Sequence, residues 1–142
     1  MFIMSLGADI RIGDVFIVDF VGDGSVQSGR RPAVVFQNNK GNAHSPNVVV
    51  FPMTSKIKKR SLPTHVFVGA SESGLSRNSV VLCENPVCIP KSMLGRYVTT
   101  LPESALSRLA AANLLASGAV AFLRQEDLHI LRDRAAVLNG VA

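Results

Sequence analysis

The stretch from Gly24 to Ser71 contains neither aspartate nor glutamate. It carries seven of the 15 Lys and Arg residues of the chain and none of the 10 Asp and Glu residues. Its formal charge is therefore +7, and the remaining residues sum to −2, which gives the net +5 of the whole chain. A basic field confined to one segment attracts nucleic acid, because binding releases counterions from the phosphates whatever the base sequence. We therefore expect a polyanion as partner.

Cysteine is also scarce, because Cys83 and Cys88 are the only two. They lie five positions apart, and Cys83 closes the apolar run Val80–Leu82. A structural zinc site needs about four ligands of the right kind close together. We expect two buried, reduced thiols rather than a disulfide or a metal centre, which fits a reducing, cytoplasmic compartment.

No apolar run is long enough to cross a membrane. The most apolar stretch, Leu109–Leu123, has 15 residues and contains Asn113 and Ser117, whereas a spanning helix needs about 20. We expect a buried or interfacial helix there and no membrane association. Met1–Ala8 is apolar but lacks the basic leader and length of a signal peptide. The high apolar share of 47% favours a surface shared with a second copy, and hence a homodimer.

Short β-branched runs separated by turn residues predict a small β-sheet or barrel between Asp14 and Leu101, in a single domain spanning residues 1–142. The predicted strands are Val15–Phe20, Ala33–Gln37, Val48–Phe51, His65–Val68 and Val80–Glu84. Five prolines are placed between these runs, where a missing backbone donor does no harm: Pro46, Pro52, Pro63, Pro86 and Pro90. The connections are a flexible loop over 21–30, a polar turn over 38–46 and a basic loop over 55–63.

Two helices are predicted after the strands. Thr100 and Glu103 have the spacing of a capping box, with Pro102 between them, so a helix should begin there. Its apolar positions recur at three and four residues and should face the sheet: Leu106, Leu109, Ala110, Asn113 and Leu114. A weaker repeat after Gln125 predicts a second short helix: Leu128, Leu131, Ala135 and Leu138.

Several common catalytic signatures are missing. The sequence has no phosphate-binding P-loop and no nucleophile elbow. The three histidines fall in separate predicted elements, so only the fold would bring two of them together as an acid–base pair. The acids of the predicted sheet, Asp14, Asp19 and Glu84, lack metal-ligand spacing, which argues against a metal-dependent nuclease.

What the sequence does contain is a cation at the entrance of a strand. Pro32 biases the preceding Arg31 to an extended conformation, so its guanidinium would be presented from a firm base. Thr54 follows the run 48–53 and stands at the mouth of the basic loop. If these two strands pair antiparallel, Arg31 and Thr54 lie at the same end of the sheet. The alternatives are an ordinary Arg-Pro turn, a threonine that merely ends a strand, and a basic loop that is merely solvated.

At these residues the chain resembles the MazF/PemK family of toxin endoribonucleases. Five short fragments occur in the order and with the gaps of that family: Gly13–Phe16, Gly29–Pro32 with Gln37–Asn38, Met53–Thr54, Leu62–Val66 and Ser79–Leu82. The resemblance covers about residues 10–123. It implies an α+β fold, a small SH3-like β-barrel with a C-terminal helix packed on the sheet, and a homodimer.

The resemblance also implies metal-independent cleavage of single-stranded RNA without a cofactor. The ribose 2′-hydroxyl attacks the adjacent phosphorus and leaves a 2′,3′-cyclic phosphate and a 5′-hydroxyl. The catalytic arginine and threonine of the family fall on Arg31 and Thr54. Negative charge builds on the non-bridging oxygens of the phosphate during the attack, and a fixed guanidinium together with a hydroxyl donor can stabilise that charge. A guanidinium pKa of about 12 or more makes proton abstraction costly, so we assign Arg31 as electrostatic stabiliser first and proton donor second.

The expected RNA contacts follow from the same resemblance. The backbone would be held by Arg30, Ser55, Lys56, Lys58, Lys59 and Arg60. Gln37 and Asn38 are polar enough to meet bases, or they simply close the turn. An acidic antitoxin tail would compete for the same basic groove.

Three departures from the family pattern stand out. Ile12 precedes Gly13 where the family has arginine, Val26 stands where some relatives carry an acid, and residues 125–142 extend past the usual end. Two other functions remain open. A gyrase poison of the same fold would need a C-terminal tryptophan motif, and this chain has no tryptophan. A catalytically silent RNA-binding module would fit the first two departures.

Overall fold

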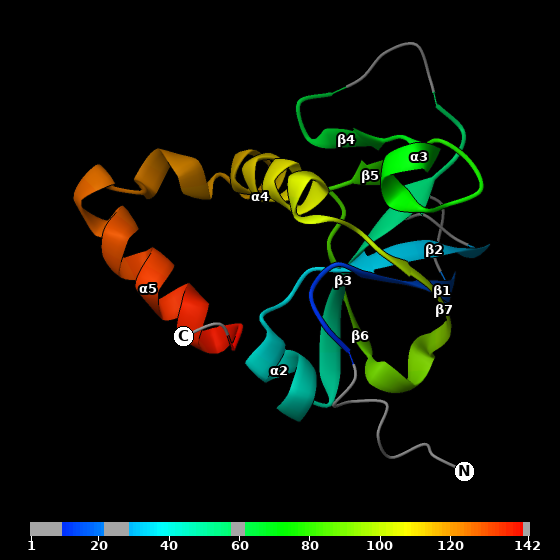
Figure 1. Ribbon diagram of the computed structural model, residues 1–142, viewed down its shortest axis with the longest axis horizontal. Helices are drawn as coiled ribbons and strands as arrows, with labels where there is room; N and C mark the ends of the chain where they lie inside the picture. The colour runs from blue at the N-terminus through cyan, green and yellow to red at the C-terminus, as the bar shows by residue number, and fades with distance from the viewer. Residues whose placement is uncertain (1–9, 22–28, 58–61, 141–142) are drawn as a thin grey trace.

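The computed structural model describes residues 10–21, 29–57 and 62–140, and it contains an antiparallel sheet flanked by helices. The strands are β1 (Asp14–Phe20), β2 (Gly29–Val35), β3 (Asn47–Thr54), β4 (His65–Val68), β5 (Ser79–Leu82), β6 (Val87–Pro90) and β7 (Leu94–Thr100). The α-helices are α2 (Asn39–His44), α3 (Ala70–Ser73), α4 (Glu103–Ser117) and α5 (Leu128–Leu138). Short 3-10 turns, η2 (Lys91–Met93), η3 (Ala119–Phe122) and η4 (Gln125–Asp127), connect some of these elements. Figure 1 shows the arrangement, and its mixed α+β character is as predicted.

Strand β3 organises the sheet, whose order is β4-β5-β3-β2-β1-β7 with β6 also paired to β3. On one side β3 pairs with β2, and on the other it pairs first with β6 and then, at Met53 and Thr54, with β5. The pairings found among the described residues leave β4 and β7 at the two ends of the order. They establish the antiparallel sheet, whereas closure into a barrel stays a prediction.

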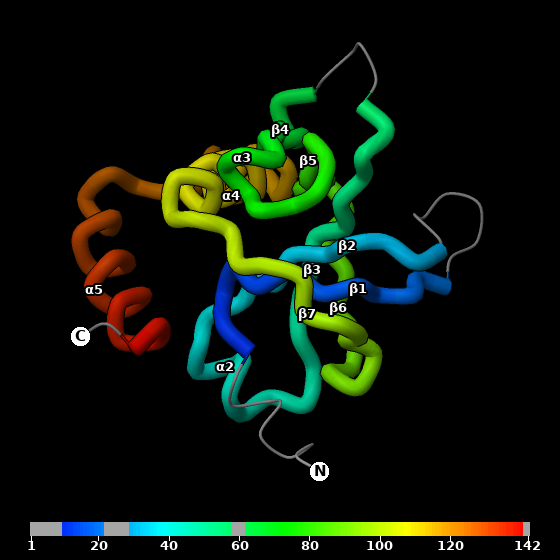
Figure 2. Tube along the Cα trace, turned by 45° about the vertical axis from the view of Figure 1, so that its right-hand side comes forward, coloured from blue at the N-terminus to red at the C-terminus, as the bar shows by residue number. Residues whose placement is uncertain are grey.

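Two apolar clusters lie on opposite faces of the β2–β3 pair, because side chains alternate along a strand. Val34 and Phe51 face one cluster, and the neighbouring Val35 and Val50 face the other. The first cluster includes three fully or nearly buried residues of α4, namely Ala105, Leu109 and Ala112. Helix α4 therefore packs on the sheet, as predicted, and Figures 1 and 2 show it beside β4 and β5.

The five predicted strands are present, with shifted ends at β1, β2, β3 and β5, but the proline argument was wrong for Pro52 and for Pro90, which ends β6 opposite Asn47. Pro52 lies inside β3, opposite Ala33. The hydrogen bond from Phe36 N to Val49 O sets the alternation of the ladder, so the nitrogen of Pro52 points away from β2. On the side away from β2, β3 pairs with β6 up to Val50 and with β5 from Met53. Pro52 lies between these two pairings, so its missing N–H removes no hydrogen bond. Strands β6 and β7 and the helices α2 and α3 were not predicted.

Helix α4 begins where it was predicted, but the capping box is wrong. Pro102 is the N-cap residue and makes no side-chain hydrogen bond to the helix. The Thr100 hydroxyl instead donates to Asp14 Oδ1 at 2.7 Å, which ties β7 to the start of β1. The predicted apolar face is also displaced, because Ala110 is exposed and Ala105 and Ala112 are buried.

Helix α5 confirms the second predicted helix, but its apolar residues are not covered. None of its residues is buried, and five large apolar side chains are 40–62% exposed: Leu128, Ile130, Leu131, Val137 and Leu138. The segment from η3 onward leads away from the sheet and returns beside α2 (Figures 1 and 2). There Asn39 donates from its backbone nitrogen to Asn139 Oδ1 at 2.9 Å. No helix of the described residues has the length and hydropathy to cross a membrane.

Candidate active site

Arg31 lies in β2, where it is half-buried and opposite Val18 of β1. By strand alternation its side chain leaves the same face of the sheet as those of Ala33 and Val35. Both of those residues belong to the buried apolar cluster on that face. Arg31 therefore stands at the edge of a buried patch, with its position fixed by the strand beneath it.

Thr54 is the last residue of β3 and is also half-buried. Strands β2 and β3 pair antiparallel, and Ala33 and Pro52 are the last residues paired toward this end. Arg31 and Thr54 each lie two residues beyond that pair, so by strand alternation their side chains leave the same face as those of Ala33 and Pro52. The prediction that the two lie at the same end of this pair is confirmed.

The Thr54 hydroxyl has a defined local partner. Its Oγ1 accepts a hydrogen bond from the backbone nitrogen of Lys56 at 3.1 Å. Because the oxygen is the acceptor in this contact, its own hydrogen can be donated to another group. The side chain thus presents an O–H donor next to the face that carries Arg31.

Arg30 does not share the face of Arg31. It is exposed and lies opposite Asp19 of β1, with its side chain on the other side of the strand. The sheet therefore separates these two cations, although they are adjacent in sequence.

Gln37 and Asn38 lie past the other end of β2, more than five residues from Arg31, and both have local partners. Asn38 is the N-cap of α2 and accepts from Gly41 N at 2.9 Å. The Gln37 amide donates to Asn42 Oδ1 and to the Asn47 carbonyl, each at 3.2 Å. These contacts are those of residues that close a turn, which was the alternative to base contact.

The basic loop after Thr54 is described only in part. Ser55 and Lys56 are exposed and follow directly on Thr54. Lys58, Lys59 and Arg60 lie outside the described residues, as does the Val26 position.

The Ile12 departure falls at a backbone turn that leads into β1. Ile12 donates its backbone N–H to Asn39 Oδ1 at 2.7 Å. Gly13 follows with a φ of 95°, a conformation that L side chains rarely adopt. Asp14 is buried and accepts from Arg11 N at 2.9 Å. The turn is therefore held by backbone and by Asn39, without an arginine at position 12.

Other polar groups on the sheet are also defined. His65 Nε2 lies 2.8 Å from Glu84 Oε2, across the β4–β5 pair. Cys83 is buried as predicted, and this burial, together with the nearby Glu84 charge, raises the pKa of its thiol to about 12. Cys88 is exposed, so the prediction that both thiols are buried was wrong for this one. Among the described residues no three His, Cys, Asp or Glu side chains gather closely enough to hold a metal ion.

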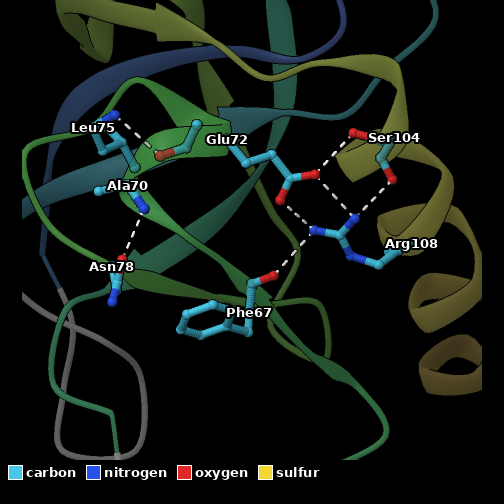
Figure 3. Close-up of polar contacts among 8 residues, drawn as sticks. Phe67, Ala70, Glu72, Leu75, Asn78, Ser104 and Arg108 are labelled. Carbon is cyan, nitrogen blue, oxygen red and sulfur yellow. Dashed lines mark hydrogen bonds and ion pairs between the residues drawn. The ribbon is translucent and has the colours of Figure 1, made fainter.

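A polar clamp joins α3, α4 and β4 (Figure 3), and it was not predicted. Arg108 donates to both carboxylate oxygens of Glu72, at 2.7 and 3.1 Å, and to the Phe67 carbonyl at 3.2 Å. Ser104 Oγ donates to the same carboxylate at 2.8 Å. These hydrogen bonds, that of Arg108 first, hold the pKa of Glu72 below its ordinary value. No sequence signal pairs residues 36 positions apart, whereas the alternation of β4 would have placed Phe67 on the face opposite the buried Val66 and Val68.

Comparison with known proteins gives the family of the chain. Residues 11–114 match the sequence pattern of the PemK-like, MazF-like toxins of type II toxin-antitoxin systems. The chain belongs to this family. The MazF-like chain is also 37% identical over 101 residues to the endoribonuclease MazF of Staphylococcus saprophyticus, a match that covers 70% of this chain and 84% of the relative.

Two solved structures are similar to the chain in sequence and fold. Toxin MazF-mt6 of Mycobacterium tuberculosis is 30% identical with a TM-score of 0.62, and the match covers 74% of the MazF-like chain and 96% of the relative. A mycobacterial endoribonuclease in complex with its cognate antitoxin is 27% identical, with a TM-score of 0.64 and coverage of 77% and 95%. Because the family pattern ends at residue 114, η3, η4 and α5 lie beyond it.

Proposed function

We propose that this chain is the toxin of a toxin-antitoxin pair and a sequence-selective, metal-independent endoribonuclease that cuts single-stranded RNA such as mRNA. The observation that supports the proposal is that Arg31 and Thr54 lie at the same end of the antiparallel β2–β3 pair, each two residues beyond the paired Ala33 and Pro52. A guanidinium and a hydroxyl on one face form a donor pair suited to one phosphate group. The membership of the MazF/PemK-like family supports the same reaction class.

In the proposed reaction the 2′-oxygen of the substrate forms a bond to phosphorus and the 5′-oxygen of the next nucleotide leaves. The products are a 2′,3′-cyclic phosphate and a 5′-hydroxyl. Arg31 stabilises the negative charge that develops on the non-bridging oxygens, since its guanidinium stays charged at neutral pH. Arg31 also serves, in second place, as proton donor to the leaving 5′-oxygen. The proton that the 2′-hydroxyl loses passes to solvent water, which also returns a proton to Arg31. Thr54, whose Oγ1 accepts from Lys56 N, donates its hydrogen to a phosphate oxygen.

The RNA backbone would follow the basic loop after Thr54, from Ser55 and Lys56 through Lys58, Lys59 and Arg60, because cations there neutralise phosphates. Arg30 lies on the face of the sheet opposite Arg31. It would contact the RNA only if the RNA strand passed around the edge of the sheet. Gln37 and Asn38 are the proposed base contacts with the weakest support, since both are engaged in closing a turn.

The regulation we propose follows from charge. The segment from Gly24 to Ser71 is +7, so an acidic antitoxin segment would compete with RNA for it. One of the related structures is of an endoribonuclease with its cognate antitoxin, which supports such a partner here. We further propose the SH3-like barrel and homodimer of the family, acting in the cytoplasm where mRNA is found.

The test is to incubate the purified chain with a mixed pool of single-stranded RNA in EDTA. We expect cleavage products whose 5′ ends accept phosphate from polynucleotide kinase without prior phosphatase treatment. Arg31→Ala should lower the rate by about 10²–10³-fold, as the loss of one oxyanion donor does.

The matched control is Arg132→Ala, which removes the same charge from α5, outside the residues that match the family. It should cut like the parent chain. Intact RNA with the parent chain, or equal cutting by Arg31→Ala, would overturn the proposal. Inhibition of DNA supercoiling with RNA left intact would favour the gyrase-poison alternative instead.

A further inference from the structure

One aromatic side chain of the sheet is exposed although its neighbours in the strand are buried. Phe67 in β4 is 53% exposed, whereas Val66 and Val68 beside it are 6% and 0% exposed. Exposed apolar side chains on an edge strand favour aggregation unless a binding partner covers them. The exposure of Phe67 therefore indicates a binding role.

The register places Phe67 on the same face as Thr54. Thr54 and Phe67 are both opposite Val80 of β5, one from β3 and the other from β4. The three residues therefore form one row across the sheet, and their side chains share a face. Arg31 lies at the same end of β2, two residues beyond the Ala33–Pro52 pair and on the same face by alternation, so the phenyl ring lies on the face that carries the proposed catalytic pair.

The distance along this row suits a neighbouring nucleotide. Two strand spacings of about 4.8 Å separate β3 from β4, so Phe67 lies about 10 Å from Thr54. A single strand rises about 3.4 Å per stacked nucleotide. The ring is thus within about three nucleotides of a phosphate held by Thr54.

The backbone of Phe67 is held firmly. Arg108 donates to its carbonyl oxygen on β4, and Glu72 fixes the guanidinium with two hydrogen bonds. Figure 3 shows the ring pointing away from Arg108 and α4. The ring is therefore anchored at its backbone.

We propose that Phe67 is a stacking platform for an unpaired base of the RNA strand, within about three nucleotides of the scissile phosphate. The inference rests on the proposed endoribonuclease function and adds a base-binding subsite to it. A base stacks on an aromatic ring whatever its identity, so the subsite contributes affinity and sets the position of the strand. The cations that follow Thr54 draw in the phosphates of the same strand, which makes RNA rather than an apolar partner the occupant.

The chain contains no tryptophan, so a tryptophan introduced by substitution can be followed by its fluorescence without background from another tryptophan. Phe67→Trp introduces a single fluorophore at the proposed subsite and keeps a stacking ring. The probe is a random pool of 2′-O-methyl RNA, which lacks the attacking hydroxyl and cannot be cut. We expect the pool to quench the fluorescence of Phe67→Trp at saturation. The matched control, Phe122→Trp, introduces the same fluorophore at an 86% exposed phenylalanine in η3 and should not be quenched.

The second arm measures affinity and cleavage. Phe67→Ala should weaken binding of the pool by about five- to a hundredfold, the range that base–aromatic stacking supplies, and should raise KM more than it lowers kcat. Phe67→Trp should bind within about threefold of the parent chain, and Phe67→Leu should not restore binding.

Unchanged affinity in Phe67→Ala, or restoration by Phe67→Leu, would overturn the subsite while leaving the proposed cleavage intact. A lower molecular mass of Phe67→Ala in sedimentation would also overturn it, because the ring would then be a contact between subunits. Failure of the parent chain to cut RNA would overturn the proposed function instead, and the fluorescence arm reports on the subsite separately.

Discussion

Arg30 and Arg31 differ in position more than in chemistry. Both are arginines in β2, but Arg31 is half-buried on the face of an apolar cluster and Arg30 is exposed opposite Asp19. A desolvated, fixed guanidinium stabilises developing charge better than a solvated one, because the local dielectric is lower and no reorganisation is needed. The role proposed for Arg31 thus depends on its burial as well as its charge.

The two cysteines differ in the same way, and their reactivity should show it. Burial raises the pKa of the Cys83 thiol to about 12, so this thiol stays protonated at pH 8, and only a thiolate reacts rapidly. Cys88 is exposed on β6. Iodoacetamide at pH 8 should modify Cys88 in the native protein and Cys83 only after denaturation, as read by mass spectrometry of peptides. Equal native labelling of both would contradict the burial of Cys83.

At the scale of elements, the clamp of Glu72 and Arg108 holds the edge strand β4 to α4. An edge strand leaves backbone groups unpaired, and Arg108 satisfies the Phe67 carbonyl while it binds the carboxylate of α3. The clamp therefore keeps the end of the row that carries Thr54 and Phe67 in place.

The clamp should make stability depend on pH in a defined direction. The hydrogen bonds of Arg108 and Ser104 lower the pKa of Glu72 in the folded state, so the carboxylate stabilises the fold above its ordinary pKa of 4.5. This contribution is lost as the pH falls through the lowered value. A double-mutant cycle with Glu72→Gln and Arg108→Gln, followed by urea unfolding, should give a coupling energy at pH 7 that declines as the pH falls below 4.5 and through the lowered pKa of Glu72. A coupling independent of pH would contradict the ion pair.

Helix α5 belongs to the fold only weakly. It has no buried residue, and hydrogen bonds from Asn39 to Asn139 hold its far end. Deletion of residues 124–142 should lower the free energy of unfolding by no more than about 2 kcal/mol, the net contribution of a few hydrogen bonds. Urea unfolding of the shortened chain measures this change. A much larger loss would mean that the exposed apolar residues of α5 are covered in solution, for example by a second copy.

The sequence predicts those elements that are determined by neighbouring residues, and it does not predict those that depend on tertiary contacts. The strand His65–Val68 was predicted with its observed ends, because its turn residues and β-branched side chains are local signals. Strand β7 was missed, since Leu94–Thr100 has mostly exposed positions and no apolar alternation. Thr100 has the spacing of a cap but bonds to Asp14, 86 residues away. Tertiary contacts of this kind leave no local trace.

The same holds for the site. Pro32 and the ends of the apolar runs identified Arg31 and Thr54, and the turn chemistry of Asn38 was weighed correctly as an alternative. Which residues share a face follows only from the register of the strands. That is why Arg30 was grouped with Arg31, and why Phe67 was not considered.

For the whole molecule, the uneven charge is the main determinant of what binds. The +7 segment between Gly24 and Ser71 contributes β2, β3 and β4, which carry Arg31, Thr54 and Phe67. The rest of the chain sums to −2. A single polyanionic strand is therefore drawn to the part of the sheet that would cut it.

This charge predicts a strong dependence of RNA binding on salt. Each phosphate neutralised in a single strand contributes about −0.7 to the slope of log K against log salt, so about four contacts give a slope near −3. Binding of the 2′-O-methyl RNA pool between about 50 and 200 mM salt measures it. Lys56→Gln should reduce the slope by about 0.7, whereas Arg132→Gln on α5 should leave it unchanged. An affinity indifferent to salt would contradict an electrostatic groove.

If Arg31 and Thr54 act together on one phosphate, a double-mutant cycle in single-turnover RNA cleavage will show their coupling. Arg31→Ala and Thr54→Val should each slow cleavage by about 10²–10³-fold. The double variant should lose far less than the product of the two, because groups that act as a unit are not additive. Losses that multiply, or either single variant cutting at the parent rate, would contradict the shared site.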